Sequence, residues 1–227
     1  FDVTGAAVVK ILDIIKNCSP RTKFFQPFSS NIFGNSSKKT QNETEEFSPL
    51  SIYALGKVTA YFACQLYRDI HGLKIYGAIF YNHESEIRPE EYVTRKITKS
   101  VAKIYYGKQN KLYLGDIKAK IDWGYAKDYV KAAYKIMQLS KPDVFVIGSG
   151  TSYSVEHFAK KCFQYVGLNY KKYLRVNKKL LRPSKTVSLI GDSTKAKKTF
   201  NFKIETNLDK IVSIMMDNDL KIEMNEK

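Results

Sequence analysis

The sequence predicts an α/β fold in which a parallel sheet is flanked by helices, and three observations lead to this expectation. Apolar runs of strand length alternate with segments of helical periodicity along the chain. The run at 74–81 is apolar almost throughout, as is typical of a strand buried on both faces of its sheet. With 227 residues, 44% of them hydrophobic, the chain is long enough to bury a substantial core.

Turn and stop signals separate the expected elements. Ser19 and Pro20 stop the first helix, and Gly72 follows the end of a long second helix at His71. In order, we expect a helix at 4–17, a strand at 23–28, a polar loop at 35–48, a helix at 51–70, a strand at 74–81, a helix at 93–106, a strand at 111–115, a helix at 125–139, a strand at 143–147 and helices at 154–166 and 207–222.

The chain carries a formal net charge of +16. Much of it lies between Lys171 and Lys198, where ten Lys or Arg residues stand against a single acidic residue, Asp192. Such a stretch favours a polyanionic partner: nucleotide phosphates, RNA, an acidic protein surface or an anionic membrane. A basic surface that only faces solvent would have the same composition. A polyanionic partner and a solvated surface therefore both remain open. We find no pattern of aromatic residues typical of a dedicated RNA-binding module.

The cysteines and the apolar runs bear on the compartment. Cys18, Cys64 and Cys162 are odd in number and far apart, which predicts neither a disulfide framework nor a metal site and favours a reducing, intracellular compartment. No apolar run reaches 18 residues, so no transmembrane segment is expected. The chain begins at Phe1 without a signal-peptide pattern, and we expect it to be a fragment, a processed product or a protein whose beginning lies elsewhere.

The pentad at 53–57 carries the first indication of chemistry. Tyr53 and Lys57 are four residues apart, which on a helix places a phenol and an ammonium on one face, one turn apart. The ammonium favours the tyrosinate by Coulomb attraction, which would suit the phenol to pass a proton during hydride transfer. An ordinary solvated helix face has the same spacing, because the chain contains 16 Tyr residues.

Further motifs follow one another in a fixed order around this pentad. They are DVTG at 2–5, FFQPFSSNIFG at 24–34, SPLSIY at 48–53, NHES at 82–85, VTRKI at 93–97, DWGYAKDYV at 122–130, RP at 182–183 and GDSTKAK at 191–197. Together they resemble, nearly from end to end, the latter two-thirds or so of the GDP-mannose 4,6-dehydratases. That family belongs to the extended short-chain dehydrogenases/reductases, the NAD-dependent epimerase/dehydratase group.

The resemblance implies a domain organisation. It predicts part of a Rossmann-like NAD(P)-binding domain at 1–135, with interleaved substrate-domain segments at about 83–120. The segment 136–227 would complete the sheet and add a small C-terminal substrate-binding subdomain. The chain has no Gly-x-x-Gly-x-x-Gly turn, and the segment Gly148-Ser149-Gly150 lacks the third glycine. We therefore expect the N-terminal glycine-rich half of the sheet to be absent from this chain.

The resemblance also implies a reaction. The family uses NADP to oxidise C4 of GDP-mannose, eliminates water across C5 and C6, and returns the hydride to C6. By this likeness Tyr53 would accept the proton at C4, and Lys57 would lower the phenol's pKa and hold the nicotinamide ribose. Ser29 would donate a hydroxyl hydrogen bond to the sugar. His83 and Arg88 fall on cofactor-binding positions, and Asn82, Lys96 and Arg182 fall on positions that contact the sugar nucleotide.

Several positions depart from the family pattern. Asn31 stands where the family has the Glu that takes the C5 proton, and an amide cannot accept and return a proton near neutral pH. Losing a positioned general base costs roughly 10²–10⁴ in rate. Ionic contacts would also be lost or reversed at Leu50, Ile87, Ile121 and Lys185.

Two classes of function therefore remain open. One is enzymatic: a dehydratase-like protein that is impaired as this chain stands, or a nucleotide-sugar reductase or epimerase, cytoplasmic by family or in an organelle. The other is a non-catalytic homologue kept as a structural subunit of a larger assembly. A homo-oligomer is expected in either case, because the family pairs the helix at 51–70 between subunits. That helix carries the apolar residues Val58, Tyr61, Phe62 and Leu66.

Overall fold

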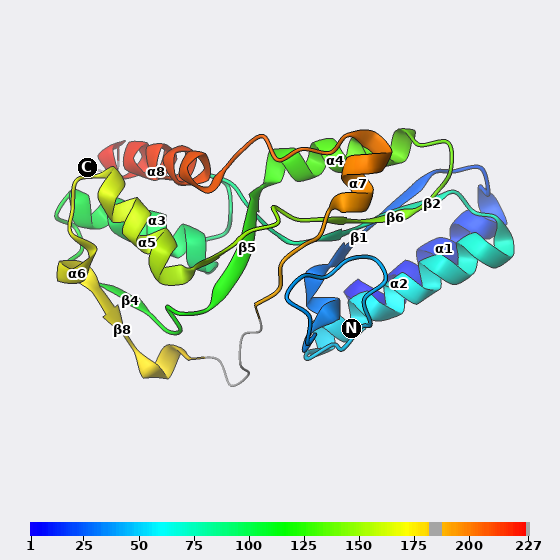
Figure 1. Cartoon of the computed structure of the whole chain (residues 1–227), viewed down its shortest axis with the longest axis horizontal. Coiled ribbons are helices and arrows are strands. Elements are labelled where there is room, and N and C mark those ends of the chain that lie inside the picture. Colours follow the sequence, from blue (N-terminus) through cyan, green and yellow to red (C-terminus); the bar gives the residue numbers. More distant parts are fainter. Residues whose placement is uncertain (182–187, 226–227) are drawn as a thin grey trace.

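A three-stranded parallel sheet forms the centre of one half of the molecule (Figure 1). The computed structural model describes residues 1–181 and 188–225. The strands are β1 (Phe24–Ser29), β2 (Ile75–Phe80) and β6 (Val144–Ile147), in the spatial order β1-β2-β6. Ser29 pairs with Phe80, so β1 and β2 end together at one edge of the sheet. The expected parallel α/β fold is confirmed.

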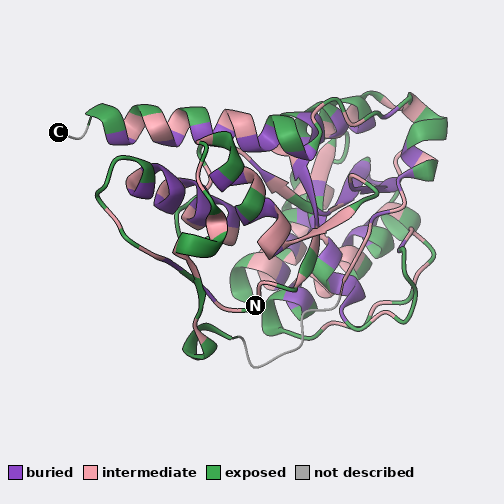
Figure 2. Ribbon diagram, turned by 60° about the vertical axis from the view of Figure 1, so that its left-hand side comes forward, coloured by how far each residue is buried: buried purple, intermediate pink, exposed green. Residues whose placement is uncertain are grey.

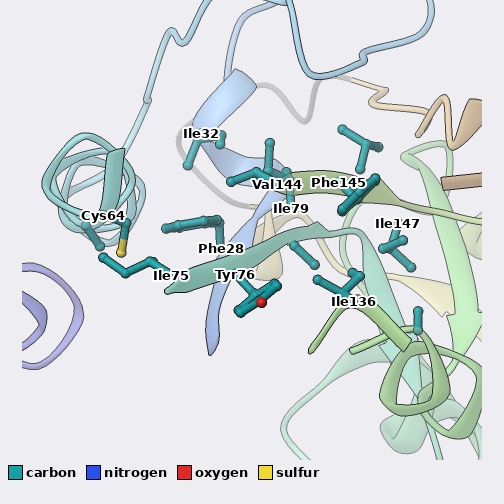
Figure 3. Close-up of a cluster of buried hydrophobic side chains, with 14 of the residues drawn as sticks. Phe28, Ile32, Cys64, Ile75, Tyr76, Ile79, Ile136, Val144, Phe145 and Ile147 are labelled. Atoms are coloured by element: carbon teal, nitrogen blue, oxygen red, sulfur yellow. The ribbon is translucent and has the colours of Figure 1, made fainter. Parts of the chain in front are cut away.

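Helices cover both faces of this sheet because its side chains alternate between them. Phe28 packs against Tyr61 of α2, with ring centroids 5.1 Å apart, and Phe80 packs against Tyr129 of α4 at 5.4 Å. Figure 3 shows Cys64 of α2 beside Ile75, with Ile136 of α4 beyond Tyr76 on the other side. The covering helices are α1 (Ala7–Cys18), preceded by the π-helical turn η1 (Asp2–Ala6), then α2 (Ile52–His71), α4 (Ala126–Gln138) and α7 (Thr194–Phe200).

Caps at both ends define α2, the helix that carries the pentad. The Ser51 hydroxyl accepts a 3.1 Å hydrogen bond from the Ala54 amide, which satisfies one of the free N–H groups of the first turn. Gly72 ends the helix in the left-handed conformation at φ 64°, which glycine adopts without steric cost. The predicted bounds of 51–70 are therefore confirmed to within a residue, and the pentad lies on the first turns.

The other half of the molecule is mainly helical. Its three packed helices enclose a second hydrophobic core that includes Trp123 and Phe158. Figure 2 shows the buried residues of α8 gathered along one side of that helix. The elements here are β3 (Asn82–Glu84), α3 (Val93–Tyr105), β4 (Leu112–Leu114), β5 (Lys120–Tyr125), β7 (Ser152–Ser154), α5 (Val155–Tyr165), α6 (Tyr170–Tyr173), β8 (Leu174–Val176), η3 (Lys178–Leu180) and α8 (Leu208–Asn225).

The long helices and the strands of the central sheet match the sequence expectations, and β4 lies within the strand expected at 111–115, whereas β3, β5, β7, β8, α6 and α7 were missed. β3 runs parallel to β5, which also pairs antiparallel with β7, and β4 pairs parallel with β8. Of the missed strands, β3, β7 and β8 contain three residues each, too few for a periodicity to be recognised. In β5, charged residues interrupt the apolar run. The two cores draw on residues from both sides of position 135, so the domain boundaries stay a prediction.

The cysteines lie apart in the fold. Cys64 and Cys162 are buried and Cys18 is exposed, and all three are free thiols. Burial raises the pKa of the Cys64 thiol to about 12, so this group stays protonated at neutral pH. Within the described ranges no helix is both long and apolar enough to span a bilayer. The same ranges contain no group of His, Cys, Asp and Glu side chains arranged to hold a metal ion.

Candidate functional site

Two side chains at the start of α2 come together near the end of β1. Lys57 Nζ lies 5.9 Å from the centre of the Tyr53 ring. The same Nζ donates a 2.9 Å hydrogen bond to the carbonyl oxygen of Pro27 in β1. Burial lowers the pKa of the Lys57 ammonium, while Tyr53 keeps 46% of its surface exposed. The structure therefore presents a phenol to solvent beside a cation that is partly dehydrated and held in place.

The end of β1 and the turn after it supply two more of the predicted side chains. Ser29 caps the 3₁₀ turn η2 (Ser30–Phe33), and its Oγ accepts a 3.3 Å hydrogen bond from the Asn31 amide. The Asn31 residue is exposed. Gly34 closes the turn at φ 46°, and a Cβ there would lie 1.7 Å from the Ser48 carbonyl oxygen, so only glycine fits. Both predicted residues thus lie at the same end of β1 as the phenol–ammonium pair.

His83 follows the end of β2 and is held from two sides. Its Nδ1 lies 2.9 Å from the Tyr81 carbonyl oxygen, which requires the proton on Nδ1 and leaves Nε2 as an acceptor in the neutral ring. The imidazole packs against Tyr129 of α4, with ring centroids 4.9 Å apart. Asn82 precedes it in β3 and is exposed. The carboxyl ends of β1 and β2 therefore carry predicted residues of both the catalytic and the cofactor groups.

Arg88 lies on the loop after β3, where its guanidinium stacks on an aromatic ring. Its Cζ is 3.6 Å from the centroid of Tyr92. Its Nε lies 3.4 Å from Glu84 Oε2, an ion pair without the alignment of a hydrogen bond. Thr94 donates a 2.5 Å hydrogen bond to the same carboxylate oxygen. Burial raises the pKa of the Glu84 carboxyl, although Thr94 and Arg88 both oppose that shift.

The remaining predicted residues are less closely gathered. Lys96 is half-buried on α3, and it has no ion-pair partner among the residues that the structure describes. Arg182 lies outside the described residues, as does Lys185. Of the positions that depart from the family pattern, Leu50 and Ile87 are exposed and Ile121 is half-buried in β5. The roles assigned to all these residues stay predictions.

Asp122 is a further candidate, which the sequence indicated only as the first residue of the motif at 122–130. Its side chain is fully buried in β5, and its oxygens accept hydrogen bonds from the amides of Ser149 at 2.9 Å, Gly150 at 3.1 Å and Gly191 at 3.0 Å. Burial raises the pKa of this carboxyl, and the amide donors oppose the shift. One carboxylate thus joins the loop after β6 to a distant segment. A carboxylate directly between the apolar residues Ile121 and Trp123 was the sequence signal.

The family comparison gives one extended match. A family model described as "GDP-mannose 4,6 dehydratase" matches residues 1–215. GDP-mannose 4,6 dehydratase 2 from Arabidopsis thaliana is 38% identical over 230 residues, covering 100% of this chain and 61% of the relative. The GDP-mannose 4,6 dehydratase of Homo sapiens is 35% identical over 240 residues, covering 97% and 64%. The chain thus spans less than two thirds of the length of these relatives.

Solved structures extend the likeness to the fold. RMD from Pseudomonas aeruginosa, complexed with NADPH, superimposes with a TM-score of 0.89 at 15% identity, covering 97% of this chain and 74% of that one. A dTDP-glucose 4,6-dehydratase from Bacillus anthracis, in complex with NAD, gives 0.85 at 18% identity, covering 99% and 69%. At these identities the likeness establishes the fold alone.

Proposed function

The chain belongs to the GDP-mannose 4,6-dehydratase family, and from this premise we propose that it carries the sugar-nucleotide chemistry of a dehydratase-like protein. The substrate would be GDP-mannose and the cofactor NADP. One observation carries the proposal. Tyr53 and Lys57 converge at the carboxyl end of β1, and Lys57 is anchored there to the Pro27 carbonyl oxygen. Ligands of parallel α/β proteins bind at this edge of the sheet.

The donor groups at this edge suit a phosphorylated dinucleotide. The Lys57 ammonium can donate to ribose hydroxyls, and the planar guanidinium of Arg88 can pair with a phosphate. His83 Nε2 is open to a further partner, because Nδ1 is already engaged with the Tyr81 carbonyl oxygen. When bound, the cofactor would supply hydride acceptance from C4 and hydride return to C6. The preference for NADP over NAD rests on the family resemblance.

The protein's own residues would move and hold protons. The tyrosinate form of Tyr53 would take the C4 hydroxyl proton and become the phenol, and the positive charge of Lys57 would lie beside it. The Ser29 hydroxyl has its proton available for the sugar, because the bond that it makes to the Asn31 amide is one that it accepts. No carboxylate occupies position 31, so removal of the C5 proton would be slow. The chain would therefore support oxidation at C4 better than elimination.

Replacing Asn31 with Glu tests this account. We expect Asn31→Glu to raise formation of the 4-keto, 6-deoxy product by about tenfold or more, because a well-positioned general base contributes roughly 10²–10⁴. The lower figure allows for the exposed position of residue 31. The measurement is the mass of the sugar nucleotide, which falls by one water, in full-length protein loaded with NADP. The matched control is Asn35→Glu on the next loop. No gain over this control in cofactor-loaded protein would contradict the proposal.

A second candidate is a non-catalytic structural subunit, and the apolar surface of α2 supports the assembly that this candidate requires, which is expected of an enzyme as well. Phe62, Leu66 and Ile70 are all more than half exposed on the described chain, although they belong to a helix that otherwise covers the sheet. Such a surface is typical of a contact between subunits. We expect wild-type protein to sediment as an oligomer and Leu66→Lys to shift it toward the monomer. A wild-type monomer at all concentrations would contradict this.

The polyanionic partner expected from the basic stretch at 171–198 stays a prediction.

A further inference from the structure

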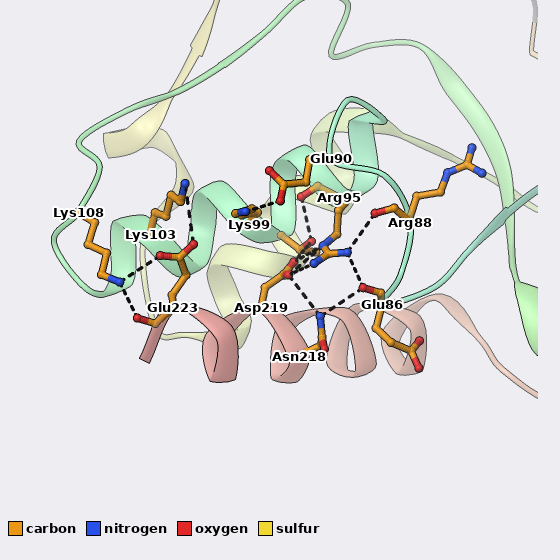
Figure 4. A network of polar contacts seen from close by, with 11 residues as sticks. Glu86, Arg88, Glu90, Arg95, Lys99, Lys103, Lys108, Asn218, Asp219 and Glu223 are labelled. Atoms are coloured by element: carbon orange, nitrogen blue, oxygen red, sulfur yellow. Dashed lines mark hydrogen bonds and ion pairs between the residues drawn. The ribbon is translucent and has the colours of Figure 1, made fainter. Parts of the chain in front are cut away.

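A buried carboxylate on α8 has no part in the reaction proposed above. Asp219 is 1% exposed. It accepts hydrogen bonds from Arg95 Nε at 2.8 and 3.1 Å and from Thr98 Oγ1 at 2.6 Å, and Arg95 Nη2 lies 2.8 Å away. Figure 4 shows this guanidinium lying against the carboxylate between α3 and α8. The cost of dehydrating two charges can exceed their attraction, so a buried ion pair does not by itself stabilise the fold. The further contacts of Arg95 indicate another role for this pair.

Arg95 reaches past Asp219 to the loop that carries Arg88. Its Nη1 donates to the carbonyl oxygen of Glu86 at 2.5 Å and to that of Arg88 at 3.0 Å. From α8, the Asn218 amide group donates to the same Glu86 carbonyl oxygen at 3.2 Å. Two neighbouring residues of the C-terminal helix thus hold, directly or through Arg95, the backbone of a loop more than 120 positions earlier in the chain.

The loop is short and carries its functional side chain at its centre. The backbone of Arg88 is fixed by Arg95, while its guanidinium is fixed by Tyr92 and Glu84. Glu84 directly follows His83 in β3. Arg88 is therefore linked to α8 through Arg95, and to the strand that carries His83 through Glu84.

We propose that Asp219 is a positioning residue that acts through Arg95 to hold the loop at 85–91, and with it Arg88, in place for the cofactor. The role of Arg88 toward the cofactor rests on the proposed function, whereas the clamp on the loop does not. The Asp219 carboxylate orients the Arg95 guanidinium through Nε and Nη2. The Nη1 amino group is thereby directed at the carbonyl oxygens of Glu86 and Arg88. Without the carboxylate, Arg95 would be free to leave them.

The same helix provides a matched control. Glu223 lies one turn after Asp219, is also 1% exposed, and also binds the α3 side of the interface. Its Oε2 lies 3.2 Å from Lys108 Nζ and its Oε1 lies 3.9 Å from Lys103 Nζ. Figure 4 shows these lysines at the opposite end of the network from Glu86 and Arg88. Glu223 therefore shares the burial and helix docking of Asp219, with no bond to the loop among the described contacts.

The experiment compares Asp219→Asn with Glu223→Gln in the full-length protein. Amide hydrogen exchange across 85–91 should become about tenfold faster in Asp219→Asn, a coupling of ordinary size, and should stay at the wild-type rate in Glu223→Gln. Arg95→Lys provides a second variant, which keeps the Asp219 carboxylate in place. Lysine keeps the charge opposite Asp219 but cannot also reach both carbonyls, so the loop alone should exchange faster.

Cofactor binding gives the second readout. The Kd for NADPH should rise about tenfold in Asp219→Asn and in Arg95→Lys, and should not change in Glu223→Gln. Loop exchange at the wild-type rate in both Asp219→Asn and Arg95→Lys would overturn the clamp. So would equal acceleration in Glu223→Gln, which would indicate general loosening of α8. Faster loop exchange in a protein that binds no NADPH would leave the clamp in place and contradict the proposed function instead.

Discussion

Replacing Tyr53 with Phe is expected to lower the rate of C4 oxidation by roughly 10²–10⁴-fold, the usual contribution of a positioned proton acceptor. The change removes one oxygen atom from a side chain that is 46% exposed. Lys57 would keep its hydrogen bond to the Pro27 carbonyl oxygen, because the phenol takes no part in that bond. Binding of GDP-mannose and of NADP should therefore stay close to the wild-type values, and the loss should fall on the chemical step.

The measurement is the reduction of NADP by GDP-mannose in a single turnover of full-length protein, followed by the absorbance of the reduced nicotinamide. Tyr105→Phe is the control, because Tyr105 is a comparably exposed tyrosine on α3, away from the pentad. Both variants should unfold at the wild-type temperature. A Tyr53→Phe protein that reduces the cofactor as fast as Tyr105→Phe would show that the pentad is an ordinary helix face.

The second large effect concerns stability. Asp122→Ala is expected to lower the free energy of unfolding by about 2–4 kcal/mol, because a buried donor left unpaired costs roughly 1–3 kcal/mol and two further hydrogen bonds are lost with it. The substitution would leave the buried amide of Gly191 without its acceptor and would also remove the partly buried bonds from the amides of Ser149 and Gly150. It would also open a cavity, since Asp122 is fully buried. Asp122→Asn should cost less, because its amide oxygen can still accept from some of these donors.

Urea unfolding measures this difference, with Asp116→Ala as the control. Asp116 also accepts hydrogen bonds from two loop amides, those of Lys118 and Ala119, but it is exposed, so water can replace it. Its removal should cost less than about 1 kcal/mol. If the two alanine variants lost equal amounts of unfolding free energy, the buried hydrogen bonds of Asp122 to residues 149–150 and 191 would add nothing to stability.

Local chemistry explains why much of the fold could be predicted. A helix of twenty residues with a serine at its start and a glycine after its end is recognisable from neighbouring residues alone, and α2 has both signals. The proximity of Tyr53 and Lys57 follows from the same local geometry, because residues four apart share a helix face. The strands β2 and β6 of the central sheet could be recognised because burial on both faces makes them apolar.

The contacts between distant segments could not be predicted in this way. β5 contains Lys120 and Asp122, and only the amides brought to it from 149–150 and 191 make a buried carboxylate tolerable there. Arg95 reads as an ordinary helix-surface cation until α8 places Asp219 against it.

The sequence by itself determined the order of the long helices and of the central strands, the parallel α/β class and the phenol–ammonium pair on α2, because each follows from spacing within one segment. Only the tertiary structure decided which buried charges are matched, how Asp122 joins two loops, and how α8 reaches the Arg88 loop. Those pairings depend on where the folded chain brings remote residues together, and no local periodicity encodes that distance.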